Sequence, residues 1–237
     1  MEKKQHDPQL SEIKPVLNWV DFSLFVGGII ILYIILIFGT IWLAGKLPNE
    51  KVLIYINGFL TQLSFIVLVF ILKRIRQWSW QDIGWRSVNF KKQWALILRL
   101  YLLTLIINMI YTLYLYQRGY TPPSTDVYTK LLGETTWLTY LLNLLLAVVL
   151  APLVEETLFR GIIFGSLRTY FGKWTAAAIS AALFSALHLQ VYGFFPRFIL
   201  GLVLAHLYER NRSLYPSMAF HALNNLVAMT LIAGIAP

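Results

Sequence analysis

Long apolar runs recur along the whole chain, and most of them approach the about 20 residues that a helix needs to cross a bilayer. They predict about seven transmembrane helices, within about six to eight, because the sixth run is short for a full crossing. The runs lie at roughly 20–44, 52–72, 94–116, 136–165, 174–191, 195–208 and 214–235. The first run is longer than the apolar core of a signal peptide, and no small-residue cleavage site follows it. The fold class predicted is therefore an all-α polytopic membrane protein.

Polar stretches divide this single membrane domain into three parts. Residues 1–18 form a polar tail, 19–134 hold the first three apolar runs, and 135–235 hold the last four. In the loop between the second and third runs, residues 77–93 combine aromatic with basic side chains. That combination is typical of an amphipathic segment lying at the membrane interface.

Composition strengthens the membrane interpretation. The chain is 58% hydrophobic and 13% charged, whereas soluble domains carry about 25% charged residues. A bundle of buried soluble helices is therefore disfavoured. The chain has no cysteine, which excludes disulfides and thiolate catalysis.

The chain has a net charge of +9, and the positions of its basic residues indicate the membrane topology. Fourteen basic residues fall on one side of a seven-span topology and five on the other. The fourteen are Lys3, Lys4, Lys14, Lys73, Arg74, Arg76, Arg86, Lys91, Lys92, Arg99, Arg168, Lys173, Arg210 and Arg212, and the five are Lys46, Lys51, Arg118, Lys130 and Arg197. By the positive-inside rule, the N-terminus is predicted to be cytoplasmic and the C-terminus outside. The expected partners of the basic side are anionic lipid headgroups, not nucleic acid.

Two carboxylates, Glu155 and Glu156, lie inside the fourth apolar run. An ionisable group within a bilayer costs about 2.5–3.5 kcal/mol on insertion scales, so each needs an explanation. Arg160 follows Glu156 at i,i+4, which predicts an ion pair on one helix face. Adjacent helical residues point about 100° apart. Glu155 is therefore expected to point elsewhere, without a local partner, as a general base or acid.

Histidines on later runs add further chemistry. His188 lies in the fifth run, and His221 in the seventh shares a helix face with Asn225. A lone histidine within a span is more often a packing residue, and His6 and His206 are expected to have such neutral roles. Two histidines with a glutamate and an amide supply the groups that activate water and stabilise an oxyanion. These groups can meet if the helices tilt toward one another.

Several other chemistries are excluded. The chain has no His-Glu-x-x-His run and no Gly-x-Ser-x-Gly elbow. Its aspartates lie outside the span interiors, which removes an aspartyl dyad; they are Asp7, Asp21, Asp82 and Asp126. Two non-protease classes stay open. One is a membrane scaffold or immunity factor, and the other is a transporter that relays protons through buried carboxylates.

Four motifs follow one another in order across about residues 136–230. They are Glu155-Glu156-x-x-x-Arg160, Phe184-x-x-x-His188, a small-residue helix face with Phe198, Gly201 and Ala205, and His221-x-x-x-Asn225. In these motifs the chain resembles the CAAX-processing and bacteriocin-processing (CPBP, or Abi) family of intramembrane proteases. The first 130 residues show only a generic resemblance.

The resemblance implies an intramembrane active site in a C-terminal four-helix core, residues 135–235. Glu155 and His188 would activate the attacking water, and His221 and Asn225 would stabilise the oxyanion. Glu156, Arg160 and Phe184 would support the site. The family is usually described as metalloproteases, and Zn²⁺ would be held by Glu155, His188 and His221 with an open position for water. A metal-free mechanism uses the same residues, so no cofactor is assigned.

The resemblance also suggests a substrate class and a location. A chain of this size is similar to bacterial members, which implies a multi-pass protein of the bacterial cell membrane. The expected reaction is cleavage of a small hydrophobic or membrane-associated peptide near the cytoplasmic face. The alternative is a non-catalytic scaffold or bacteriocin self-immunity factor that binds a membrane-protein partner.

Overall fold

The computed structural model describes residues 17–46, 50–120 and 136–235, and every regular element in these ranges is helical. Most of the predicted polar tail lies outside the described residues. In chain order the elements are α1 (Trp19–Ala44), α2 (Glu50–Arg76), η2 (Trp80–Ile83), α3 (Phe90–Gln117), α5 (Trp137–Asn143), η3 (Leu144–Leu150), α6 (Ala151–Glu156), η4 (Thr157–Phe164), α7 (Gly165–Ala186), α8 (Phe194–Asn211) and α9 (Tyr215–Ile235). The all-helical fold class is confirmed for this part of the chain.

Four helices among the described residues are long and apolar enough to cross a membrane. They are Trp19–Ala44, Val52–Arg76, Phe90–Gln117 and Trp137–Ala186. The multi-pass membrane character is therefore confirmed. The count of about seven spans stays a prediction. Over the described residues, the remaining helices are not both long enough and apolar enough to qualify as spans.

The fourth of these helices runs for 50 residues, and its winding changes four times between α-helical and π-helical turns. Elements η3 and η4 are π-helical, and α6 between them begins next to Pro152. Proline lacks the N–H of a regular helix, and π-helical turns occur mostly as short insertions at functional sites. At Gly172 the backbone takes φ 73°, which favours glycine and breaks the helix into two limbs. These limbs correspond to the predicted runs 136–165 and 174–191.

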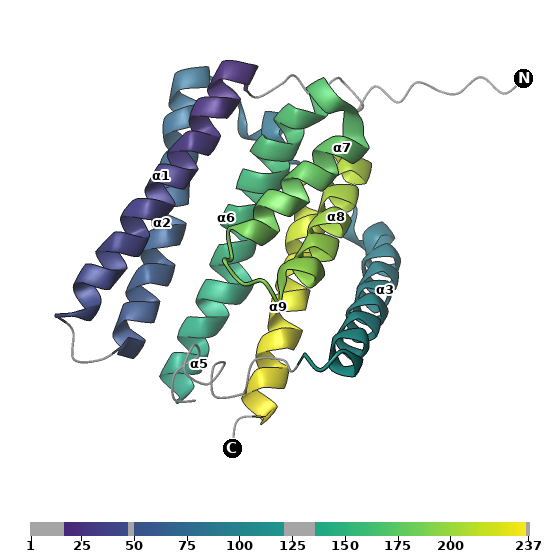
Figure 1. The fold of residues 1–237 in the computed structure, drawn as a ribbon. Helices are drawn as coiled ribbons and strands as arrows, with labels where there is room; N and C mark the ends of the chain where they lie inside the picture. The colour runs from purple at the N-terminus through teal and green to yellow at the C-terminus, as the bar shows by residue number, and fades with distance from the viewer. Residues whose placement is uncertain (1–16, 47–49, 121–135, 236–237) are drawn as a thin grey trace, which may run out of the picture.

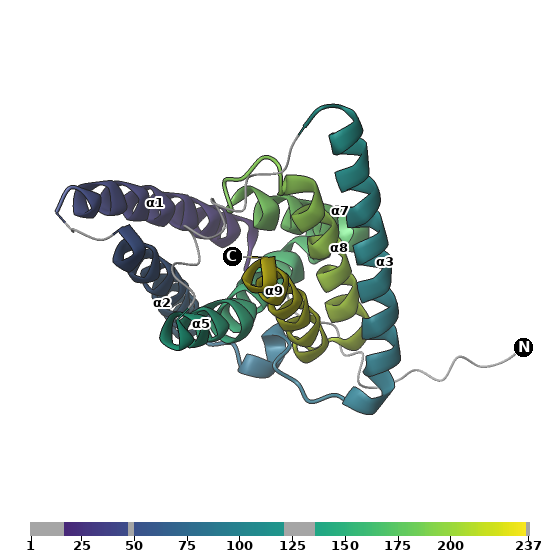
Figure 2. The same cartoon turned by 90° about the horizontal axis from the view of Figure 1, so that it is seen from below.

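The helices form two groups in space. Figure 1 shows α1 and α2 side by side at one edge, while α6, α7, α8 and α9 lie together in the middle. Seen from below in Figure 2, the α1–α2 pair extends away from the central group, and α3 lies against its opposite side. The candidate motifs are all carried by the central group.

The predicted interfacial segment, residues 77–93, packs against the helix core. Ile83 of η2 is fully buried, and a Cβ added to Gly161 of η4 would come within 2.8 Å of the Ile83 carbonyl oxygen. The amide of Leu214 donates to the Gly84 carbonyl at 2.8 Å, and Ser213 donates to the carbonyl of Arg86 at 2.5 Å. The segment therefore docks against η4 and the turn between α8 and α9.

Close packing joins α7 to α8, as the small-residue pattern predicts. A Cβ on Gly201 would lie 2.7 Å from the Cβ of Ala181, so only glycine allows this approach. Ala205, one turn further on, is buried. Small residues let helix backbones approach in a membrane, where apolar burial alone gives no preference for a helix neighbour over lipid.

Candidate active site

The ion pair predicted between Glu156 and Arg160 is present in the centre of the core. The Arg160 Nη1 lies 3.0 Å from the Glu156 Oε1, and both side chains are 0% exposed. Arg160 Nη2 also donates to the carbonyl oxygen of Gly201 at 3.2 Å, and its guanidinium lies 4.7 Å from the ring centroid of Phe184. The arginine therefore ties η4 to both α7 and α8.

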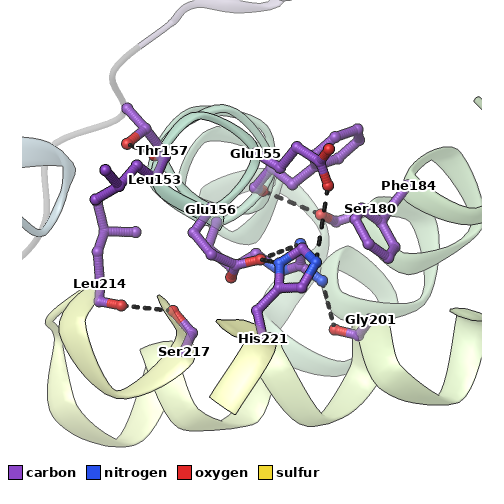
Figure 3. Close-up of polar contacts among 12 residues, drawn as sticks. Leu153, Glu155, Glu156, Thr157, Ser180, Phe184, Gly201, Leu214, Ser217 and His221 are labelled. Carbon is purple, nitrogen blue, oxygen red and sulfur yellow. Dashed lines mark hydrogen bonds and ion pairs between the residues drawn. The ribbon is translucent and has the colours of Figure 1, made fainter. Parts of the chain in front are cut away.

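His221 of α9 lies between the two carboxylates (Figure 3). Its Nδ1 is 2.9 Å from the Glu156 Oε1, and its Nε2 is 3.9 Å from the Glu155 Oε2. A carboxylate only accepts hydrogen bonds, so the imidazole donates from Nδ1 to Glu156 and turns Nε2 toward Glu155. Glu155 was expected to lack a local partner, and the group that approaches it comes from α9, a helix distant in the sequence.

His188 approaches the same region from a turn. Helix α7 ends at Ala186, so His188 follows the helix and does not lie within a fifth span as expected. Its Nδ1 is 2.8 Å from the carbonyl oxygen of Phe184. Since a carbonyl accepts, Nδ1 carries the hydrogen and the Nε2 lone pair is directed away from the helix.

Phe184 holds the two imidazoles in place. Its ring centroid lies 5.1 Å from that of His188 and 5.7 Å from that of His221, with edge-to-face geometry in both pairs. The ring centroid of Phe159 lies 5.2 Å from that of Phe184, also with edge-to-face geometry. The supporting role expected for Phe184 thus has a physical basis, because aromatic packing fixes both rings.

A cavity of about 150 Å³ brings Glu155 and His188 together. Phe159, Phe184 and Leu187 line it from the core, and Tyr33 of α1 and Phe65 of α2 line it from the other helix group. Sequence reasoning missed Tyr33 and Phe65. No local pattern marks either residue, since aromatic side chains are common throughout this chain.

Asn225 is one helical turn from His221 and contacts the same long helix. Its Nδ2 donates to the carbonyl oxygen of Ala147 in η3 at 2.8 Å. One of its two amide hydrogens is therefore used to hold α9 against η3. The oxyanion role that the resemblance implies for Asn225 stays a prediction. In that role the side-chain amide would donate its second hydrogen to the oxyanion.

The donor set for Zn²⁺ is incomplete as the side chains stand. Among the described residues, no three His, Cys, Asp or Glu side chains form a group that could hold a metal ion. Glu155 and His221 approach each other, and His188 shares the cavity with Glu155. The side chains predicted to bind Zn²⁺ therefore do not meet as one donor set in this structure.

Comparison with known proteins bears on the segment that holds these residues. Residues 136–227 match the family model for the Rce1-like proteins, described as type II CAAX prenyl endopeptidase Rce1-like. The match covers less than half of the chain, so the similarity holds for this segment alone. The match confirms the resemblance read from the motifs, since the Rce1-like segment contains all four of them.

Similarity to individual proteins is more limited. An Escherichia coli protein named "Uncharacterized 24.3 kDa protein" is 40% identical over 70 residues, which are 29% of this chain and 32% of that protein. The aligned part thus spans about a third of that relative. No solved structure matches the chain.

Proposed function

We propose that the chain is an intramembrane endopeptidase of the CAAX-protease type. The observation that carries this proposal is the placement of His221 between Glu155 and Glu156, beside the cavity that Glu155 shares with His188. Bilayer-buried ionisable groups are costly and mark functional sites. The membership of residues 136–227 in a peptidase family model supports the same conclusion.

In this mechanism Glu155 is the general base. A water molecule in the cavity lies between the Glu155 carboxylate and the His188 Nε2, and it loses a proton to Glu155 as its oxygen attacks the peptide carbonyl carbon. General acid–base catalysis of this kind contributes about 10²–10⁴-fold. His188 orients the water by accepting its second hydrogen, since the Nδ1–H is already given to the Phe184 carbonyl.

The oxyanion is stabilised by groups from α9. In this scheme His221 carries a hydrogen on both ring nitrogens: Nδ1–H donates to Glu156, and Nε2–H donates to the oxyanion. Asn225 contributes the amide hydrogen that Ala147 does not use. As the tetrahedral intermediate collapses, the C–N bond breaks and Glu155 returns its proton to the leaving amine. Glu156 and Arg160 do not touch the substrate in this scheme. They fix the orientation of His221 and join the helices.

The substrate proposed is a small hydrophobic or membrane-associated peptide. Apart from Glu155 and His188, the side chains that line the cavity are aromatic or aliphatic. The protein is proposed to reside in a cell membrane, with its N-terminus and the basic end of α2 on the cytoplasmic side. Cleavage would then take place within the membrane-embedded core.

Turnover of a fluorogenic hydrophobic peptide library by purified protein tests this proposal. The variant Glu155→Gln keeps the shape of the side chain and removes the base, so cleavage should fall by about 10²–10⁴-fold. The matched control is Glu209→Gln, which removes a carboxylate paired with Arg168 and Arg212 away from the cavity. Equal activity of wild type and Glu155→Gln would contradict the proposal.

Histidine variants sharpen the assignment. His221→Ala should abolish most turnover, while His206→Ala, at an exposed position on α8, should not. The same assay with a zinc chelator, followed by added Zn²⁺, separates the two mechanisms that the resemblance leaves open. Activity lost with the chelator and restored by zinc would favour the metal mechanism, for which the resemblance gives Glu155, His188 and His221 as ligands.

A further inference from the structure

A second cavity lies on the other side of the helix that carries Glu155. Its volume is about 510 Å³, and its walls are almost entirely apolar. Ile66, Val69 and Phe70 of α2 form one wall, Trp80 and Trp85 lie at one end, and Val154 belongs to the opposite wall. It shares no lining residue with the cavity of Glu155 and His188.

The wall formed by α2 continues into a basic side chain. Ile66, Phe70 and Lys73 follow one another at helical spacings of four and three residues, so they share one face of α2. The Lys73 ammonium lies 5.6 Å from the ring centroid of Trp80, which itself lines the cavity. Lys73 therefore stands at the tryptophan end of the cavity.

The tryptophans mark the depth of this end in the membrane. Tryptophan is enriched where the headgroups meet the hydrocarbon, and lysine and arginine are enriched on the cytoplasmic side. Lys73, Arg74 and Arg76 form the last turn of α2, and Arg74 is exposed. The cavity thus extends from headgroup level, beside positive charge, into the apolar part of the helix bundle.

We propose that this cavity binds one acyl chain of an anionic phospholipid whose phosphate pairs with Lys73. An extended peptide would bring backbone N–H and C=O groups that apolar walls cannot pair, at a cost of several kcal/mol for each group. An acyl chain carries no such groups. The basic end of α2 selects an anionic headgroup, which the cytoplasmic leaflet supplies.

Such a lipid would pack directly against the catalytic helix. Leu153, Val154 and Thr157 line the cavity, and Glu155 and Glu156 stand between them in the sequence. The acyl chain would fill the space behind the carboxylates, where α2 and α6 leave an opening. The site is independent of the proposed hydrolysis and can be tested without a substrate.

Tryptophan fluorescence in vesicles of defined composition tests the site. The full chain is reconstituted in phosphatidylcholine vesicles that contain a small fraction of lipid with brominated acyl chains, carrying either phosphatidylglycerol or phosphatidylcholine headgroups. Bromine quenches indoles in contact with the chain, and the difference between wild type and Trp85→Phe isolates the signal at the cavity. Brominated phosphatidylglycerol should quench this signal more strongly than brominated phosphatidylcholine at the same fraction.

The variant Lys73→Gln separates a specific site from ordinary surrounding lipid. It should reduce the preference for phosphatidylglycerol by about fivefold, the effect expected of one basic side chain near the membrane surface. Lys92→Gln on α3, an exposed position away from the cavity, should leave the preference unchanged. Equal quenching by the two headgroups in wild type would overturn the proposal. An equal loss in Lys73→Gln and Lys92→Gln would also overturn it, by showing a general charge effect.

Discussion

The α1–α2 pair and the central α6–α9 group are both built from apolar sequence, yet they bury different side chains. Among the described residues, the N-terminal helices bury one polar side chain, Thr104 of α3. The rest of the buried polar set belongs to the C-terminal part and consists of Glu156, Thr157, Arg160, Ser166, Ser180, Ser185, Ser213, Ser217 and His221. Hydropathy alone does not reveal this difference.

The comparison teaches how a membrane protein specifies one arrangement of helices. Lipid solvates apolar side chains as well as a neighbouring helix does, so apolar contact gives little specificity. Polar groups in the bilayer need defined partners, and small residues allow close approach. The central group therefore has an arrangement set by hydrogen bonds and close contacts, such as Arg160 to Gly201 and Ser180 to Phe159. The α1–α2 pair exposes most of its large apolar side chains.

The largest effect expected outside catalysis comes from breaking the central ion pair. Arg160→Met leaves the Glu156 carboxylate buried beside His221 without its cation, which should cost about 3–5 kcal/mol of stability. The comparison is Arg76→Met, which removes the half-exposed ion pair between α2 and Asp21 of α1. That pair should contribute at most about 1 kcal/mol.

Thermal unfolding in detergent, followed by circular dichroism, measures both variants. A similar loss in Arg160→Met and Arg76→Met would show that the two helix groups depend equally on their charges. The contrast between a specifically packed core and a loosely packed pair would then be wrong.

A glycine substitution tests the same contrast through packing. Gly201→Ala places a methyl group 2.7 Å from the Cβ of Ala181, so α7 and α8 must separate, at a cost of about 1–3 kcal/mol. Gly39→Ala in α1 meets no atom within 4 Å and should be neutral or slightly stabilising, because alanine favours the helix. Unfolding midpoints check the difference, and equal midpoints would remove close packing as the reason for the small-residue face.

The smallest effect concerns the one place where α1 reaches the active-site cavity. Tyr33 lines the cavity, and we propose that its hydroxyl makes a neutral hydrogen bond to the substrate. Tyr33→Phe removes that bond, and such a bond contributes about 0.5–1.5 kcal/mol. The value of kcat/KM for peptide cleavage should therefore fall by about two- to tenfold. Tyr116→Phe on the exposed face of α3 is the control and should have no effect. Equal values for wild type and Tyr33→Phe would confine the active site to the central group.

Much of this protein could be predicted from periodicity and local spacing. The apolar runs correspond to helices because a bilayer leaves no other way to pair the backbone groups of an isolated segment. The Glu156–Arg160 pair follows from i,i+4 geometry within one helix, and the Gly201 contact from the spacing of small residues. In each case the residues that determine the structure are close together in the sequence.

The tertiary structure alone decided that the side chains of the candidate site lie close together. Glu155 and Glu156 point in different directions, as helix geometry requires, but His221 enters between them from α9 and reaches both. The approach of Tyr33 from α1 to the cavity also depends on contact between segments far apart in the chain. Local sequence patterns predict which side chains share a helix face. Which faces meet depends on helix tilt, on the π-helical turns and on the break at Gly172, and the spacing of residues within one helix face contains none of this information.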